Sequence, residues 1–490
     1  MHKESLTIRV LFITGLMIVG RAPVPAQSPL DYSVSTPRPI NPATDSTNPS
    51  ARATQTLNPY LGSTPSNEVV QGEIKLSLED AIARGLRFNL GLIDSSEADA
   101  TARAQRQQAL AALLPQISAR AQQTYENLSF KELGIKLPAR AGFQIPATSG
   151  AFGYSEARVV AQVNAFNLQL LSKYKAEKAQ EAASVFNTKD ARDVVVYAVG
   201  AAYFQVVASQ ARLRTEQAAL ASARELNAQV ADQFKAEVSP EIDVLRAQVE
   251  LSTAEQRVVN ATNDLEKDKL TLDRITGIPL NQAWTPSGDY DYVPLPGDEA
   301  TAPKVRFDVA SLKESVSAAE LDVKAARAER LPAVSLEANY GGAGLNIGSY
   351  NQVYAVSGVV SVPIFTGGRI RSETHEAEAT LAQRRAEYQD LQSRVDYDVR
   401  VALLDIAASD SAVKVAAKNK ALAARALTQS QDRYANGVTN YLEVVEAQQA
   451  LVTSSENYIA SLFSFNVAKI SLARALGSSE TRLASLFGHK

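Results

Sequence analysis

Residues 369–436 have the sequence RIRSETHEAEATLAQRRAEYQDLQSRVDYDVRVALLDIAASDSAVKVAAKNKALAARALTQSQDRYAN, which contains neither glycine nor proline. As one α-helix this stretch would extend about 100 Å at 1.5 Å per residue, far beyond the helices of ordinary globular domains. A second stretch, residues 168–236, has no proline and one glycine, Gly200. Because such long helices need packing partners along their length, the sequence predicts a coiled coil or an extended helical tube.

The segment after each long stretch has a heptad pattern. In the first, spacings of three and four alternate at Val244, Ala247, Leu251, Ala254, Val258, Ala261, Leu265, Asp268, Leu272 and Ile275. The same spacing returns between Val444 and Ala475, and it predicts left-handed supercoiling. A plain two-stranded coiled coil is one interpretation. The alanine-rich remaining faces favour contact on two sides, as in a tube.

The two halves of the chain are internal repeats. Asp243-Val244 and Ala247-Gln248 return as Glu443-Val444 and Ala447-Gln448, at an offset of 443 − 243 = 200 residues. Duplication is the simplest explanation of an extended match at a fixed offset. Each half is predicted to contain a helix, two strands and then two very long helices.

Four short segments, two in each half, alternate apolar and polar residues with a period of two. Their apolar positions are Ile117, Ala119, Ala121 and Tyr125, then Ala157, Val159, Ala161 and Val163, then Val334, Leu336, Ala338 and Tyr340, and finally Tyr354, Val356, Gly358, Val360 and Val362. About ten residues cross an outer membrane when the strand is tilted. A half-buried soluble sheet would show the same pattern, but the long helices and an export signal favour the membrane.

A membrane sheet must close, because lipid offers no hydrogen-bond partner to an open edge. Four strands cannot enclose a lumen, and about eight strands fill their interior with side chains. Three chains, with twelve strands, are therefore the smallest assembly that leaves a duct.

The first 26 residues predict a signal peptide. Lys3 and Arg9 flank the start of an apolar run over residues 10–20, and small residues precede a cleavage point after Ala26. A transmembrane anchor is the alternative, but the run is shorter than the roughly 20 residues that span a bilayer.

The remaining boundaries follow from composition. Residues 27–72, rich in Pro, Ser, Thr and Asn, predict a disordered tail. The first repeat is expected at 73–276 and the second at 305–477, with a Pro/Gly-rich linker at 277–304 and a C-terminal tail at 478–490.

Composition argues against catalytic, metal and cofactor sites. The chain has no cysteine and three isolated histidines, and its net charge of −3 provides no basic surface for nucleic acid. Gly367-Gly368-Arg369 is not followed by Lys-Ser or Lys-Thr, which excludes a P-loop. Backbone freedom at a strand-to-helix bend is the better explanation of these glycines.

Over roughly residues 77–476 the chain resembles the TolC-type outer-membrane efflux protein family. The resemblance rests on the repeat, on the strand-to-helix passage VPIFTGGR at 362–369, and on the helix tip YANGVTNYLEVVEA at 434–447. It implies an α+β membrane protein in which four strands per chain contribute to a trimeric 12-strand outer-membrane barrel. This barrel would be continuous with a long periplasmic α-helical tunnel, and the linker would form part of an equatorial collar.

The resemblance also implies a function without catalysis. Such a homotrimer lies in the Gram-negative outer membrane and is a passive exit duct for efflux or secretion. A periplasmic adaptor couples it to an inner-membrane pump that supplies the energy. A structural or adhesive trimeric coiled coil of the cell surface is the alternative, and it would have one membrane anchor at one end.

Two places are expected to matter for this function. The barrel–tunnel junction contains Pro363, Gly367 and Gly368. The gating and adaptor-docking tips contain Ser239, Pro240, Tyr434, Gly437, Val438 and Thr439. Ser239-Pro240 predicts an N-cap followed by proline in the first helical turn, and Asn440 with Glu443 predicts a start like a capping box. Loops 127–156 and 341–352 are expected to be extracellular.

The entrance constriction is assigned to Glu443, Glu446 and Asp243. Glu443 and Glu446 are three residues apart and share a helix face, and by resemblance they match an acidic entrance ring. The local alternative is that carboxylates in a first helical turn stabilise the helix dipole by about 0.3–1 kcal/mol. Crowded carboxylates are expected to have raised pKa values.

Overall fold

The computed structural model describes residues 58–66, 72–129, 148–288, 291–295, 306–346, 348–477 and 479–487. The chain divides into two units, Met1–Ala53 and Thr54–Lys490, and every described residue belongs to the second. The predicted signal peptide and most of the predicted tail therefore lie outside the described residues.

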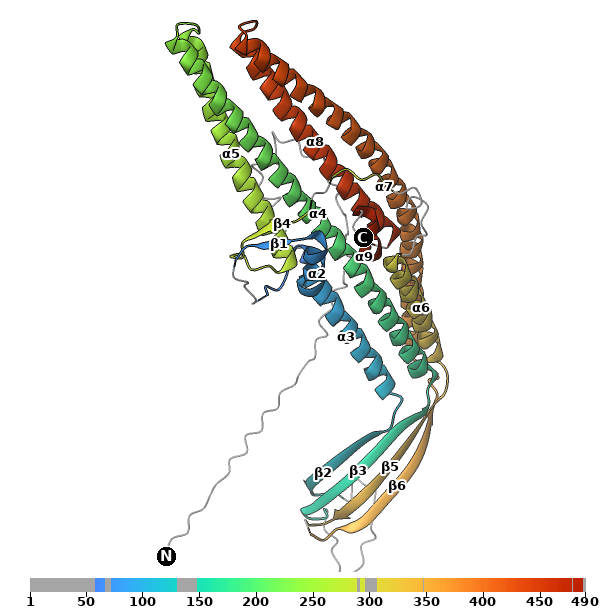
Figure 1. The fold of residues 1–490 in the computed structure, drawn as a ribbon. Helices are drawn as coiled ribbons and strands as arrows, with labels where there is room; N and C mark the ends of the chain where they lie inside the picture. Colours follow the sequence, from blue (N-terminus) through green and yellow to red (C-terminus); the bar gives the residue numbers. More distant parts are fainter. Residues whose placement is uncertain are drawn as a thin grey trace, which may run out of the picture. The chain divides into compact units, whose positions relative to one another are not determined.

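The predicted order of elements is confirmed in both repeats (Figure 1). The first contains α2 (Leu78–Phe88), α3 (Leu90–Ala111), β2 (Gln116–Glu126), β3 (Phe152–Phe166), α4 (Leu168–Lys235) and α5 (Glu241–Thr276). The second contains α6 (Phe307–Ala328), β5 (Ala333–Gly344), β6 (Asn351–Ser361), α7 (Arg369–Ala435) and α8 (Tyr441–Leu476). Each glycine- and proline-poor stretch forms one helix, of 68 residues in α4 and 67 in α7.

The two longest helices hold the shorter ones in two rows. Towards the sheet, α3 packs on α4, and α6 packs between α4 and α7; towards the tips, α5 packs on α4, and α8 packs between α4 and α7. The heptad positions of α5 include the fully buried Ala254 and Leu272. On α8 a further buried row, Gln448, Val452, Ser455 and Ile459, lies beside the heptad face. Gln448 donates to the carbonyl of Ala219 on α4 at 3.1 Å, which confirms contact on two sides for α8.

Two described helices, α4 and α8, contain windows apolar enough to cross a membrane, but these windows are 50% and 61% buried within the chain. That burial is typical of core helices. Length and composition alone therefore do not identify either helix as a membrane span.

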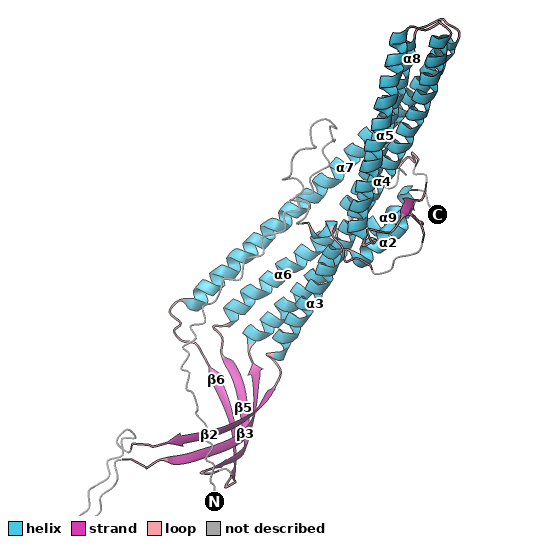
Figure 2. Ribbon diagram, turned by 90° about the vertical axis from the view of Figure 1, so that its left-hand side faces the viewer, coloured by secondary structure: helices cyan, strands magenta, loops and turns pink. Residues whose placement is uncertain are grey.

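The four long strands form one antiparallel sheet in the order β2-β3-β5-β6 (Figure 2). The register brings the four predicted apolar sets onto one face, with Ala119 opposite Val159, Val159 opposite Tyr340, and Tyr340 opposite Tyr354. This face is exposed in the single chain, where Tyr125 keeps 80% and Val356 77% of its surface. The strands also extend into the predicted loops: β5 continues to Gly344, and β6 begins at Asn351.

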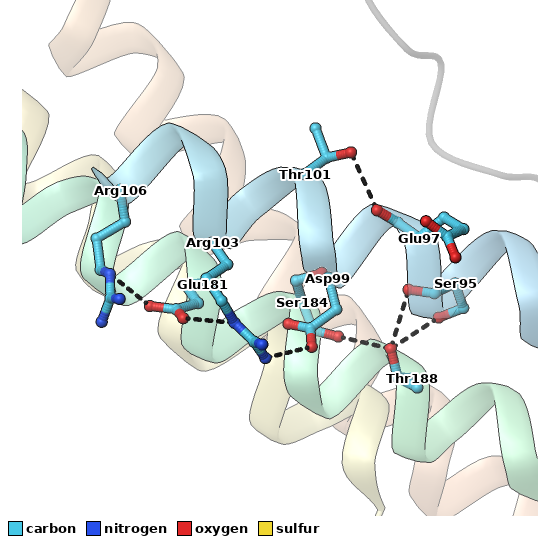
Figure 3. Close-up of polar contacts among 9 residues, drawn as sticks. All are labelled: Ser95, Glu97, Asp99, Thr101, Arg103, Arg106, Glu181, Ser184 and Thr188. Carbon is cyan, nitrogen blue, oxygen red and sulfur yellow. Dashed lines mark hydrogen bonds and ion pairs between the residues drawn. The ribbon is translucent and has the colours of Figure 1, made fainter. Parts of the chain in front are cut away.

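Polar contacts join the helix that precedes β2 to the helix that follows β3 (Figure 3). Glu181 on α4 binds two arginines of α3, Arg103 at 3.6 Å and Arg106 at 3.2 Å. About two turns further along the helix pair, the hydroxyls of Ser95 and Thr188 lie 3.1 Å apart. Because these helices carry paired strands, the contacts fix the β2–β3 hairpin on the helical part.

Two segments that composition predicted to be a linker and a disordered tail contain regular structure. In the linker, β4 (Trp284–Pro286) pairs in parallel with β1 (Ile74–Leu76), and Trp284 is 3% exposed. The predicted disordered tail is wrong for residues 58–66, where Asn58 caps a short 3₁₀ helix, Pro59–Leu61. Tyr60 packs so closely on Gly91 that a Cβ there would lie 2.4 Å from the ring.

Within the predicted C-terminal tail, residues 479–487 form helix α9 (Ser479–Phe487). Its Leu486 is 1% exposed and belongs to the main apolar core. The Nζ of buried Lys469 donates to the carbonyl of Leu486 at 3.0 Å, and Arg192 pairs with Glu480 at 2.7 Å. Contacts with residues far away in the sequence therefore hold α9 in place. The composition of the last residues does not indicate these contacts.

The buried carboxyl of Asp273 should make stability depend on pH. It accepts a hydrogen bond from the indole of Trp284 at 2.7 Å, and burial raises its pKa from 3.8 to about 7. Between these values the native state binds more protons than the unfolded state, so the free energy of unfolding falls as pH rises. We expect D273N to keep the acceptor, to unfold at a higher temperature than the parent at pH 8, and to lose much of the pH dependence between 4 and 7.

Thermal unfolding of the detergent-solubilised protein across this pH range checks the prediction. Asp308 is the matched control, since Arg306 offsets its desolvation and lowers its pKa. D308N should therefore destabilise at pH 7, opposite in sign to D273N. A lower unfolding temperature for D273N at pH 8 would contradict the prediction.

Candidate functional site: the helix tips and the barrel junction

The two helix tips reverse direction with the same backbone conformation. Gly437 has φ 71° and its equivalent in the first repeat, Glu237, has φ 59°. After each of them the next amide returns to the preceding helix, from Val238 to Gln233 at 2.9 Å and from Val438 to Arg433 at 2.8 Å. Left-handed backbone costs a non-glycine residue roughly 1–2 kcal/mol, so the first tip carries a strain that glycine removes from the second.

The start of α8 agrees with its prediction, whereas the start of α5 does not. Asn440 is the N-cap of α8, and its side-chain oxygen accepts from the amide of Glu443 at 3.2 Å. In the first tip the N-cap position is Pro240, without a side-chain cap. The prediction that Ser239 caps α5 is wrong. Ser239 instead interacts with the Tyr434 side chain on the other hairpin, and a local pattern cannot reveal such a long-range contact.

Two tyrosines hold the tips of the two hairpins together. Tyr434 and Tyr441 are 9% and 3% exposed, and their rings lie 6.3 Å apart within a cluster that includes Val230 and Ala247 of the first hairpin. The hydroxyl of Tyr434 donates to Oε1 of Gln233 on α4 at 2.6 Å. Burial raises the pKa of Tyr441 to about 12. Separating the tips would therefore break an apolar contact and a hydrogen bond.

The predicted entrance carboxylates have different surroundings. Glu443 accepts hydrogen bonds from the hydroxyls of Thr439 and Ser430, and its Oε1 lies 3.1 Å from Nη1 of Arg433. Thr439 above all, together with Arg433, holds the pKa of Glu443 below its ordinary value. Within one chain this direction is opposite to the one that carboxylate crowding predicts.

The other two carboxylates differ in their pairing and in their exposure to solvent. Asp243 is paired with Arg246 at 3.3 Å and keeps 18% of its side-chain surface. Glu446 is exposed on the surface of α8. Of the three, Glu446 is therefore the one whose charge faces solvent most freely within the chain.

Next to the tips the structure shows a groove that the sequence did not single out. It has a volume of about 450 Å³ and is lined by Ile242, Leu245, Arg246, Val249, Glu250, Tyr441, Leu442 and Val445. On its α5 side the apolar residues Ile242, Leu245 and Val249 lie outside the heptad positions, and Val249 is 67% exposed. Their spacing of three and four along α5 is the signal that could have indicated a second apolar face. At the outermost end Val238 and Val438 are 75% and 66% exposed.

The junction glycines have the role in backbone geometry that the sequence predicted. Gly367 and Gly368 have φ values of 59° and 87°, and a Cβ on either would meet nothing within 4 Å. Conformation and not crowding therefore requires glycine here. Pro363 lies between the end of β6 and this bend. Directly after the bend, Arg369 pairs with Glu329, the C-cap residue of α6, and with Glu373 at 2.8 Å. These pairs fix the start of α7.

Comparison with known proteins gives a consistent result. Residues 97–278 and 301–478 match the family model described as "Outer membrane efflux protein". Over 343 residues the chain is 26% identical to the solvent efflux pump outer membrane protein SrpC of Pseudomonas putida, covering 65% of this chain and 70% of the relative. It is 27% identical over 303 residues to the alkaline protease secretion protein AprF of Pseudomonas aeruginosa, covering 59% and 62%.

A solved structure of similar fold is the Campylobacter jejuni CmeC outer membrane channel. It superposes with a TM-score of 0.72 at 17% sequence identity, covering 86% of this chain and 92% of that chain.

The difference in backbone strain between the two tips should be measurable by amide hydrogen exchange. Replacing Gly437 by Ala places a Cβ in left-handed backbone, whereas E237G removes one. We expect each substitution to change the local opening free energy by about 1 kcal/mol with opposite signs, which is about fivefold in exchange rate. Hydrogen exchange of the tip amides should therefore be faster in G437A and slower in E237G. Equal exchange in both variants and the parent would contradict this.

Proposed function

Because the chain belongs to the outer membrane efflux protein family, we propose that its tips form the entrance and docking end of a channel. The chain is one subunit of a homotrimeric outer-membrane channel-tunnel, which exports its cargo through a periplasmic tunnel. A periplasmic adaptor and an inner-membrane pump complete the system. We further propose that the chain has no catalytic activity of its own. The adhesive coiled coil lacks support, because the family match covers both repeats.

One observation carries this function most directly. The register brings the four apolar sets together on one face of the sheet, while among the described residues the outer sides of both edge strands, β2 and β6, are unpaired. In lipid those edges must pair with other copies of the chain. Twelve strands about 4.8 Å apart, tilted by about 40°, give a barrel about 24 Å across, which is wide enough for a duct.

We propose that the acidic residues of the second tip constrict the entrance. Glu443 lies in the first turn of α8, where it also stabilises the helix start through the cap at Asn440. Arg433 compensates much of its charge. Exposed Glu446 is therefore the stronger contributor to an acidic ring, and Asp243, paired with Arg246, is the weaker one.

We propose that the tips open by breaking the contact between the two hairpins. The Tyr434–Gln233 hydrogen bond and the buried ring of Tyr441 hold the tips closed within one chain. Gly437, Val438 and Thr439 form the outermost turn of the second tip, and exposed Val438 offers an apolar surface to an adaptor. Its counterpart Val238 offers the same surface on the first tip.

The cargo is proposed to be chosen by the pump. The relatives include a solvent efflux pump outer membrane protein and an alkaline protease secretion protein. A passive duct of one architecture thus serves cargo of very different size.

Replacing the entrance carboxylates should change selectivity. In planar lipid bilayers we expect the parent channel to be cation-selective and to be blocked by multivalent cations from the periplasmic side. E446A should weaken the block more than E443A, and the double variant should abolish it while trimers persist. Because the pKa of Glu443 is lowered, its contribution should persist until the pH falls below its ordinary range.

Exposed Glu255 on α5, paired with Arg224 at 3.5 Å, provides the control, and E255A should leave the block unchanged. Parental selectivity and block in the double variant would show that these carboxylates only stabilise the helix start.

Removing the hydroxyl between the tips should favour opening. Y434F keeps the buried ring but loses the bond to Gln233, a net loss of about 0.5–1.5 kcal/mol. One lost bond lowers the ratio of closed to open tips about two- to tenfold, and a homotrimer loses three, so we expect at least this change in single-channel recordings. Q233A should have the same effect, and the double variant should add little to either single change. Additive effects, or an unchanged open probability, would show that this bond does not hold the tips closed.

A further inference from the structure

The polar face of the sheet places two arginines directly opposite each other. Arg120 on β2 and Arg158 on β3 are Cα partners in the register. Both belong to the face opposite the apolar one, which is the lumen face of the closed barrel. Like charges directly opposite one another destabilise a strand pair, so this pairing calls for an explanation.

The two arginines have different partners. Arg158 is held by three groups: its Nη2 lies 3.1 Å from Oε2 of Glu156 and 3.3 Å from the hydroxyl of Tyr154, and its Nη1 lies 3.4 Å from Oδ1 of Asn339. Arg120 instead donates to the neutral amide oxygen of Gln122. The amide nitrogen of Gln122 in turn donates to Thr124 at 2.9 Å. The guanidinium of Arg120 is therefore oriented by neutral groups, and its side chain is exposed.

The neighbouring strands do not offset this charge. Next to Arg158 the register places Gly341 on β5, and next to Gly341 it places Val353 on β6. The sequence of β6, NQVYAVSGVVS, contains no Asp, Glu, Lys or Arg. Since β2 and β6 are the two edges of the sheet, closure of the trimer sets Arg120 beside the β6 strand of the next copy. Arg120 therefore faces an uncharged strand there.

Other carboxylates on this face lie too far along the strands. Glu337 is the partner of Gln162, four positions from Arg158, which is about 13 Å at 3.3 Å per residue. Exposed charges more than about 8 Å apart are largely screened at physiological ionic strength. At the level of the two arginines, each chain thus contributes two guanidiniums and one carboxylate, that of Glu156. A trimer has a net charge of 3 × (2 − 1) = +3 at this level.

We propose that the barrel lumen contains an anion-binding belt, formed by Arg120, Arg158 and Glu156 of each chain. The belt binds polyvalent anions that carry phosphate or carboxylate groups, with Arg120 as the free ligand. Guanidinium binds such oxygens in a bidentate manner, and rings of arginine select anions in pores. The proposal depends on the trimeric barrel and is independent of the acidic entrance, which lies at the other end of the duct.

Block of single channels by inorganic tripolyphosphate tests the belt. Added on the extracellular side of a planar bilayer, it should reduce the current of the parent channel. The block should be weaker in 1 M than in 0.1 M KCl, since screening shortens the electrostatic reach from about 10 to 3 Å. R120Q should raise the Kd for block at least tenfold, whereas R120K should raise it less than R120Q.

A gain-of-function variant and a control sharpen the test. E156Q removes the compensating carboxylate and raises the charge of the belt to +6. It should therefore lower the Kd for block by tripolyphosphate several-fold. This variant keeps the proposal testable if R120Q does not assemble. R327Q removes an exposed arginine of α6, paired with Glu378 at 2.6 Å, and should keep the parental Kd. Parental block in R120Q, unchanged block in E156Q, or an equal loss in R327Q would overturn the proposal.

Discussion

The free edges of the four-stranded sheet are the constraint on which the rest of the molecule depends. The backbone groups of β2 and β6 that face away from the sheet have no partner strand among the described residues, and lipid cannot supply hydrogen bonds. Closure by symmetric copies satisfies these groups and simultaneously creates a lumen. The strand count of one chain thereby determines the assembly, because fewer than twelve strands leave little bore.

The helical part also leaves a surface that a neighbouring copy can cover, but there the contact is apolar packing and not hydrogen bonding. Within the chain α8 is covered on two sides, by α4 and α7. The first hairpin instead leaves apolar residues of α5 exposed, including Val249 and Val259 at 67% each. A tube of helices closed by neighbouring copies gives such a face a partner, just as barrel closure gives one to β2 and β6.

The two ends of the duct differ in how their charges are held. At the tips Glu443 is paired with Arg433 and hydrogen-bonded to Thr439 within the chain. In the sheet Arg158 is paired with Glu156, whereas Arg120 binds a neutral amide. Trimeric symmetry triples each imbalance, so small local differences in pairing become rings of charge. The passage from sheet to helix combines the left-handed backbone of Gly367 and Gly368 with the ion pairs of Arg369 at the start of α7.

The sequence by itself determined the elements whose signal is local. The long helices, the four strands, the cap at Asn440 and the junction glycines follow from periodicity and composition over short windows. The duplication follows from the match between the two halves at an offset of 200 residues. Tertiary structure alone decided which segments meet. Residues 58–66 and α9 are ordered because Tyr60 packs against the main apolar core and Leu486 is part of it. Ser239 contacts Tyr434 and does not cap α5, and Arg120 lies opposite Arg158 because the register puts it there. These outcomes depend on contacts between residues far apart in the chain, which no local pattern encodes.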